Sequence, residues 1–106
     1  MRQKNATLKG RSEEMPRFLS FNGIIIYIYF MDYDFHKLPH FHVKYGEFNA
    51  SVGLDGTLLA GSIPAKQLNI IQTIAKEYEE EFKEAWEKAV SGENFSQIKI
   101  DKKRVK

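Results

Sequence analysis

The stretch HFHVKYGEFNASV, residues 40–52, decides the fold because polar and apolar side chains alternate along both of its halves. Neighbouring side chains of a β-strand point to opposite faces of a sheet, so this alternation is typical of strands with one buried face. A two-residue loop at Gly46-Glu47 pairs the apolar residues of the two halves with one another, and it places His42 opposite Ser51. The stretch therefore predicts an antiparallel hairpin across residues 40–52, in which Tyr45 pairs with Phe48 and Phe41 with Val52.

An isoleucine-rich segment, residues 24–30, precedes the hairpin. Its side chains are β-branched or aromatic, which favours a strand over a helix. The alternation predicts one face that carries Tyr27 and Tyr29 and a second, apolar face. We expect the core to contain the apolar face, which consists of Ile24, Ile26, Ile28 and Phe30.

The chain continues after the hairpin with a turn and a further strand. Asp55-Gly56 predicts a tight turn in which both residues have a positive φ. The turn would return the chain through a strand at residues 57–61, with Leu59 and Ile63 toward the core. Residues 95–100 have the pattern of an additional short edge strand.

Apolar residues recur every three or four positions after residue 62, which indicates one long helix. Ser62 is the expected N-cap, with Pro64 in the first turn and Gly92 at the end. A helix of this length is long for so small a domain, so we expect a bend or break near its middle. The sequence thus predicts an α+β fold: an antiparallel meander of about four strands, with one long C-terminal helix packed on one face.

Composition restricts the class of protein. A chain of 106 residues, 42% hydrophobic and 28% charged, is expected to form one globular domain. The absence of cysteine excludes disulfides and thiolate metal sites. No apolar run has the length of a membrane helix, and no secretory signal is recognisable, so we expect a cytoplasmic protein.

Charge divides the chain into three parts. Residues 1–14 lack a hydrophobic period and are expected to form a flexible basic extension, residues 15–98 the single α+β domain, and residues 99–106 a basic tail. The part of the chain between the two basic ends, residues 18–98, carries a net negative charge. Basic ends on an acidic body can contact nucleic acid or an acidic partner, although they can equally serve solubility alone.

The helix is expected to cover only one face of the sheet, so the other face can bind a ligand. His40 and His42 would project from it side by side, together with Lys44. Neighbouring imidazoles can bind a metal ion or a phosphate, or transfer a proton. The binding residues on the same face are Tyr27, Tyr29, Asn49 and Ser51. A metal site would use His40 and His42 with His36 and Asp34 from the preceding loop.

The same residues resemble a small prokaryotic family, domain of unknown function 4160. The resemblance covers about residues 15–98. It rests on the isoleucine-rich strand, the acidic and histidine-containing loop at residues 32–36, the Pro-His-Phe-His-Val strand at residues 39–43, the Ile63-Pro64 helix start and the late Trp86. It implies a compact bacterial protein that is often encoded beside another small protein, an arrangement similar to a toxin–antitoxin pair.

Three functions remain open at this point. The first is a module that binds a small protein encoded nearby, through the exposed tyrosines and histidines. The second is a small RNA-cleaving hydrolase in which His40 and His42 act as general base and acid and Lys44 stabilises negative charge. The third is a domain that binds a divalent transition metal such as zinc. A homo-oligomer is compatible with each of them.

Overall fold

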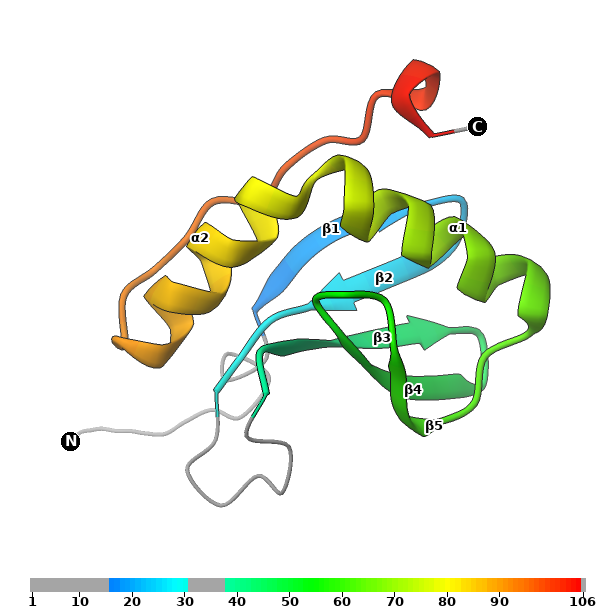
Figure 1. Cartoon of the computed structure of the whole chain (residues 1–106), viewed down its shortest axis with the longest axis horizontal. Coiled ribbons are helices and arrows are strands. Elements are labelled where there is room, and N and C mark those ends of the chain that lie inside the picture. Colours follow the sequence, from blue (N-terminus) through cyan, green and yellow to red (C-terminus); the bar gives the residue numbers. More distant parts are fainter. Residues whose placement is uncertain (1–15, 31–37, 106) are drawn as a thin grey trace, which may run out of the picture.

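The structure, a computed structural model, describes residues 16–30 and 38–105 of the chain (Figure 1). The described residues form an antiparallel sheet of five strands in the order β1-β2-β3-β4-β5, two α-helices and a short 3-10 helix. The elements are β1 (Arg17–Phe21), β2 (Ile24–Tyr27), β3 (His40–Tyr45), β4 (Phe48–Gly53), β5 (Leu58–Gly61), α1 (Ala65–Glu77), α2 (Glu79–Val90) and η2 (Lys102–Arg104). The α+β class is confirmed, with one strand and one helix more than expected.

The central hairpin has the predicted register. Tyr45 pairs with Phe48, Val43 with Ala50, and His42 with Ser51. Alternation and loop length are therefore sufficient to align β3 and β4, because any shift by one residue would turn the apolar face toward solvent.

The additional strand, β1, pairs with β2 through a tight turn at Asn22-Gly23. Both turn residues have a positive φ, 49° and 82°, and Phe21 pairs with Ile24. Asn-Gly is the residue pair that this turn type favours, since both residues tolerate the left-handed conformation. The strand prediction omitted β1, although this turn signal is present in the sequence.

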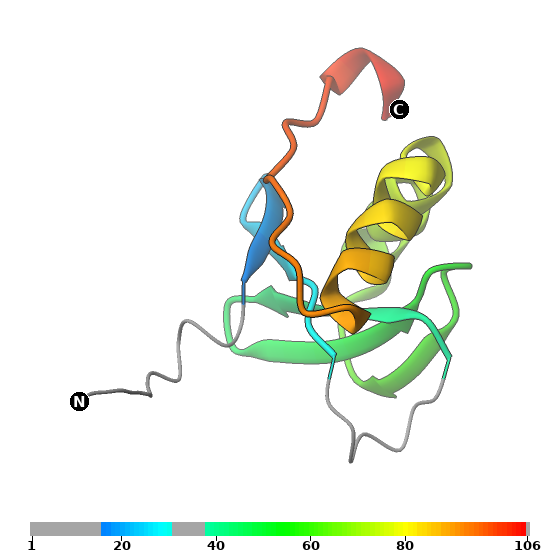
Figure 2. The ribbon, with the colours of Figure 1, turned by 90° about the vertical axis from the view of Figure 1, so that its left-hand side faces the viewer.

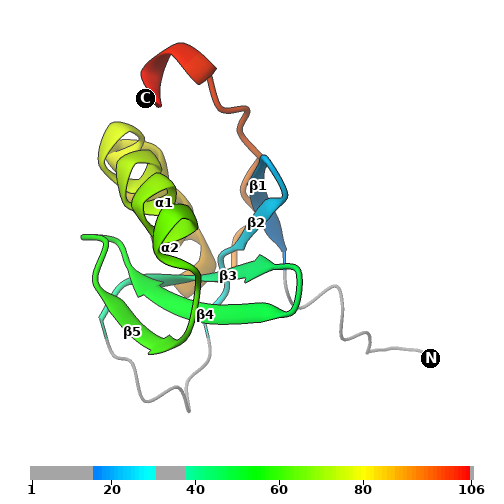
Figure 3. The same cartoon turned by 90° about the vertical axis from the view of Figure 1, so that its right-hand side faces the viewer.

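The sheet curves around the helices, which pack against its concave face (Figures 2 and 3). Ile24, Ile26 and Ile28 are fully buried there, as expected, and they meet Ile74 and Phe82 from the helix layer. Phe30 does not join this core: β2 ends at Tyr27, and the Phe30 side chain is 42% exposed. We call the opposite, convex face of the sheet the outer face.

The long helix is broken into α1 and α2 at Tyr78, whose φ of −115° and ψ of 32° lie outside the helical range. The expected break is thus confirmed, and the apolar stripe continues through it because Tyr78 is itself buried. The predicted start is wrong, since α1 begins after Pro64 and no side chain caps it. The predicted stop at Gly92 is confirmed: Glu93 N donates to Lys88 O, and Gly92 has a φ of 76°.

The C-terminal segment returns along β1 to the junction of the two helices (Figure 2). Ile98 N donates to Phe18 O at 3.0 Å, but residues 95–100 form no strand. At the junction Asp101 N donates to the Tyr78 hydroxyl at 2.8 Å, and the Arg104 guanidinium lies 4.0 Å from the centre of the Tyr78 ring. These contacts attach the end of the chain to the helix break.

The turn between β4 and β5 differs from the prediction, because only Gly56 of the pair Asp55-Gly56 has a positive φ. Gly53 N donates to Thr57 O at 2.8 Å, and Thr57 N donates to the Asp55 carboxylate at 2.9 Å. The Thr57 N–H lowers the pKa of Asp55 below its ordinary value because it stabilises the ionised carboxylate. The turn therefore contributes an acid-sensitive interaction to the fold.

The lowered pKa of Asp55 predicts a defined pH dependence of stability. A carboxyl group whose pKa is lower in the folded chain stabilises the fold fully above its unfolded pKa, about 3.9, and loses this contribution as the pH falls through the folded pKa. The wild type and Asp55→Asn should therefore differ in unfolding free energy at pH 6. This difference should shrink as the pH falls below about 3.9. Urea unfolding at a series of pH values measures it, and a difference that is independent of pH contradicts the prediction.

Two glycines with a positive φ provide a matched test of the sheet geometry. A Cβ at Gly61 would lie 2.2 Å from Asn49 O, whereas a Cβ at Gly46 would have nothing within 4 Å. Gly46→Ala should cost about 1 kcal/mol from backbone strain alone. Gly61→Ala should cost more than about 3 kcal/mol, because β5 must also move away from β4. Equal losses in urea unfolding would show that β5 does not approach β4 this closely.

Candidate functional site

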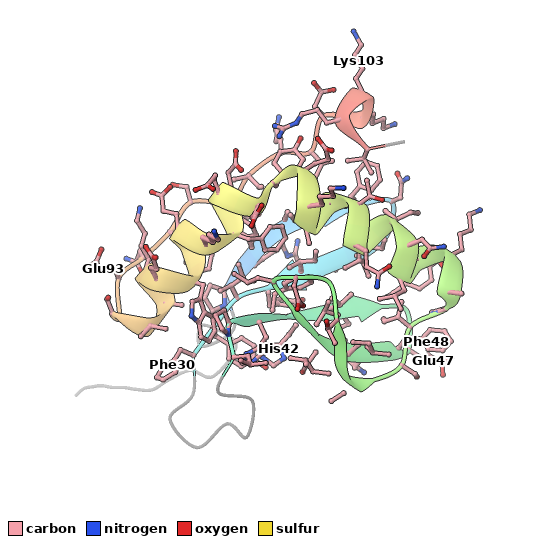
Figure 4. The ribbon with its side chains drawn as sticks, viewed as in Figure 1. Phe30, His42, Glu47, Phe48, Glu93 and Lys103 are labelled. Carbon is pink, nitrogen blue, oxygen red and sulfur yellow. The ribbon has the colours of Figure 1, made fainter. Side chains whose placement is uncertain are left out.

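The outer face contains a hollow of about 290 Å³ beside the centre of the sheet. In Figure 4 the His42 side chain lies on the side of β3 away from the helices. The hollow is lined by side chains of β2, β3, β4 and β5 and by Tyr29, which follows the end of β2. The strand residues are Tyr27, His42, Lys44, Asn49, Ser51 and Ala60. The predicted binding residues therefore lie together, and Val43, Ala50 and Gly61 complete the described lining of the hollow.

Two aromatic rings form the wall of the hollow. The Tyr29 and His42 rings are stacked, with their centroids 4.1 Å apart and their planes inclined by 12°. His42 Nδ1 and Ser51 Oγ are 3.3 Å apart, within hydrogen-bonding distance, as the pairing of these two residues across β3 and β4 requires. The stack and the cross-strand contact restrict the rotation of the imidazole, so the surface is formed in advance of any ligand.

His40 departs from the expectation that both imidazoles project into solvent. Its side chain is 1% exposed, and its ring centroid lies 5.2 Å from that of Trp86 on α2. The register of β2 with β3 ends at the pair Tyr27–His42, so His40 has no partner on β2. Where the two strands separate, the His40 ring lies against a side chain from the helix layer.

The hydrogen bond of His40 defines its tautomer. Nδ1 lies 2.8 Å from Leu38 O, and because a carbonyl oxygen only accepts, Nδ1 carries the proton. In the neutral ring the lone pair is then on Nε2. The centroids of the His40 and His42 rings are 5.0 Å apart with an interplanar angle of 74°, so the buried His40 ring supports the half-buried His42 ring.

A continuous series of ring contacts connects the outer face with the helices. It begins with Tyr29 and His42, continues through His40 to Trp86, and ends at Phe30, whose ring is 5.8 Å from that of Trp86. The helical stripe places Trp86 in the core, and in the structure its side chain is only partly buried. No spacing in the sequence relates Trp86 to His40, so this contact could not be predicted.

The predicted metal set is only partly described. His40 and His42 are adjacent, but Asp34 and His36 lie outside the described residues. Across residues 16–30 and 38–105, no group of three histidine, aspartate or glutamate side chains could hold a metal ion. Lys44, expected to stabilise negative charge, is exposed at the rim of the hollow. None of the described helices is long and apolar enough to cross a bilayer.

Comparison with known families identifies the chain. The model of a family described as a domain of unknown function (DUF4160) matches residues 23–87, more than half of the chain. The chain therefore belongs to this family, as the resemblance in sequence indicates. The matched region includes both site histidines and Trp86. Searches of curated proteins and of solved structures found no match.

The two histidines should differ in their effect on stability. His40→Ala removes a fully buried ring and leaves Leu38 O without its donor, which should cost roughly 2–4 kcal/mol. His42→Ala removes a half-buried ring and one stacking contact, which should cost about 1 kcal/mol. Chemical unfolding of both variants tests this order, and an equal or reversed order would mean that His40 is not enclosed as described.

Proposed function

We propose that the chain is a protein-binding module of a two-gene system and that its partner docks on the outer face, over the hollow beside His42. The observation that carries the proposal is the Tyr29–His42 stack. The His42 side chain of this stack lies on the side of β3 away from the helices (Figure 4). Tyrosine is enriched among the residues that dominate binding energy at interfaces. A ring that is already immobilised loses little conformational entropy when it is bound.

The lining of the hollow indicates what the partner presents. Its walls are the aromatic rings of Tyr27, Tyr29 and His42, and Lys44 is the only lysine or arginine among the described residues of its lining. An apolar side chain that enters the hollow with a carboxylate beside it would match both features. The hydroxyl of Ser51 and the amide of Asn49 add polar groups that can bind a peptide backbone.

The burial of His40 favours binding over two-histidine catalysis. A general acid and a general base must both reach the reacting atoms, within about 3 Å or through one water molecule. His40 is 1% exposed and packs on Trp86, so its ring supports the site from behind. Of His40 and His42, only His42 lines the hollow.

The product of the adjoining gene is the partner to be tested, by calorimetric titration against the purified chain. Lys44→Glu reverses the charge at the rim, and Tyr29→Ala removes half of the aromatic stack. Each should weaken binding by about tenfold or more. Lys66→Glu, in the first turn of α1 and outside the lining of the hollow, is the matched control and should bind as the wild type does. Unchanged affinity in both outer-face variants contradicts the proposal.

A hydrolase is the second candidate, because Ser51 Oγ and His42 Nδ1 are 3.3 Å apart and a histidine can activate a hydroxyl group. Under this function the purified chain would cleave RNA, and His42→Ala would reduce the rate by roughly 100-fold or more. The binding module leaves RNA intact. Incubation of labelled RNA with the wild type and His42→Ala separates the two functions.

A further inference from the structure

A second cavity, larger than the outer-face hollow, lies on the helix side of the sheet. Its volume is about 560 Å³, within the range of ligand-binding cavities. We call it the α2 groove, because α2 forms one wall and the β4–β5 turn the other. Its lining is Leu38, Pro39, Gly53, Leu54, Asp55, Thr57, Leu59, Glu79, Lys83, Trp86 and Glu87. Among the residues that the structure describes, none lines both this groove and the outer-face hollow.

Three hydrogen bonds hold the β4–β5 turn, which forms one wall of the groove, in place. Leu54 N donates to Pro39 O at 3.1 Å, and Gly53 N donates to Thr57 O at 2.8 Å. The Gln72 side chain on α1 donates to Gly56 O at 2.9 Å and so attaches the turn to the helix layer. A groove with a fixed wall can bind without first ordering its own backbone.

The groove combines apolar surface with negative charge. Leu54, Leu59 and Trp86 are half-buried in its lining, and Leu38 at its edge is 63% exposed. Large exposed aliphatic side chains beside a cavity are typical of binding sites. Lys83 forms an ion pair with Glu79 at 3.6 Å, which leaves Asp55 on one wall and Glu87 on the other to determine the charge of the groove. Thr57 N–H, by lowering the pKa of Asp55, keeps its carboxylate ionised.

The groove also adjoins the edge of the sheet. β5 is the last strand in the sheet order, and no other described strand pairs with its outer edge. Leu59 in this strand and Thr57 immediately before it line the groove. A peptide that adds to a sheet edge uses the free backbone groups for affinity and places alternate side chains on one face, where pockets select them. Leucine-like side chains on such a peptide would enter the apolar part of the groove.

We infer that the α2 groove binds a short extended peptide of a partner protein in which leucine-like side chains alternate with, or adjoin, lysine or arginine. The apolar side chains would pack on Leu54, Leu59 and Trp86. The cationic side chain would lie between the carboxylates of Asp55 and Glu87. This site is independent of the proposed function, which concerns the outer face.

Trp86 is the only tryptophan of the chain, so its fluorescence reports directly on the groove. The probe is a blocked hexapeptide of two leucine-leucine-arginine repeats, titrated into the full-length chain. We expect a saturable shift of the emission to shorter wavelength, because the peptide removes water from the indole. Two matched peptides, one with glutamate in place of arginine and one with serine in place of leucine, should each bind at least roughly tenfold more weakly.

Substitutions on α2 supply the control. Glu87→Lys reverses the charge of one wall and should weaken binding of the arginine peptide by roughly fivefold or more. Glu80→Lys changes the same charge on the same helix but outside the groove lining, and it should leave binding unchanged. Thermal unfolding of both variants verifies that they remain folded.

Four results would overturn the inference. The first is equal binding of the arginine and glutamate peptides, and the second is the absence of saturable binding of the arginine peptide. The third is competition by n-hexylammonium at the same concentration as the peptide, which would indicate a site for small cations. The fourth is a change in Trp86 emission with protein concentration alone, which would indicate that a second copy of the chain occupies the groove.

Discussion

The ring contact between His40 and Trp86 joins the sheet to the helix layer at the point where β2 separates from β3. Because His40 fills this position, the adjacent His42 ring is held against Tyr29 on the outer face. Trp86 on its other side forms part of the α2 groove. Both candidate binding surfaces thus depend on one buried imidazole, whose orientation is determined by its hydrogen bond to Leu38 O. The Pro-His-Phe-His-Val strand therefore has a structural role in addition to any direct contact with a ligand.

Much of the sheet could be predicted from the sequence, because local pattern determines it. The alternation and the two-residue loop of residues 40–52 determine the register of β3 with β4. The β1–β2 hairpin was also accessible from Asn22-Gly23, although Arg17–Phe21 lacks a clean alternation. The helix break at Tyr78 could not be located, because the apolar stripe has the same spacing on both sides of it and Tyr78 belongs to the stripe.

The sequence predicted which side chains form the candidate site, but it did not predict that the His40 side chain is buried. Tyr27, Tyr29, Asn49 and Ser51 lie around His42 as strand alternation requires. The burial of His40 depends on where β2 leaves β3 and on Trp86, which is distant in the sequence. Alternation determines the face of a sheet on which a side chain lies, but only the packing of other elements determines whether that face is covered. The same reason explains why the Phe30 side chain is exposed: it continues the apolar pattern of β2, but it lies beyond the end of the strand.

The two surfaces have complementary chemistry. The outer-face hollow has aromatic walls and a lysine at its rim, whereas the α2 groove combines Leu54, Leu59 and Trp86 with the acidic side chains of Asp55 and Glu87. The two surfaces therefore differ in the sign of the charged side chains that line them. The helices lie on the concave side of the sheet (Figures 2 and 3). The α2 groove is lined in part by α2, whereas the described lining of the outer-face hollow contains no helix residue.

The most direct test of the central claim is a cross-saturation NMR experiment that maps the footprint of the adjoining gene's product on the isotope-labelled chain. The account predicts saturation transfer to amides of Tyr27, His42, Lys44 and Ser51, around the stacked rings. It predicts none along α1, on the far side of the sheet. A footprint confined to the helices, with the outer-face amides unaffected, would contradict the account.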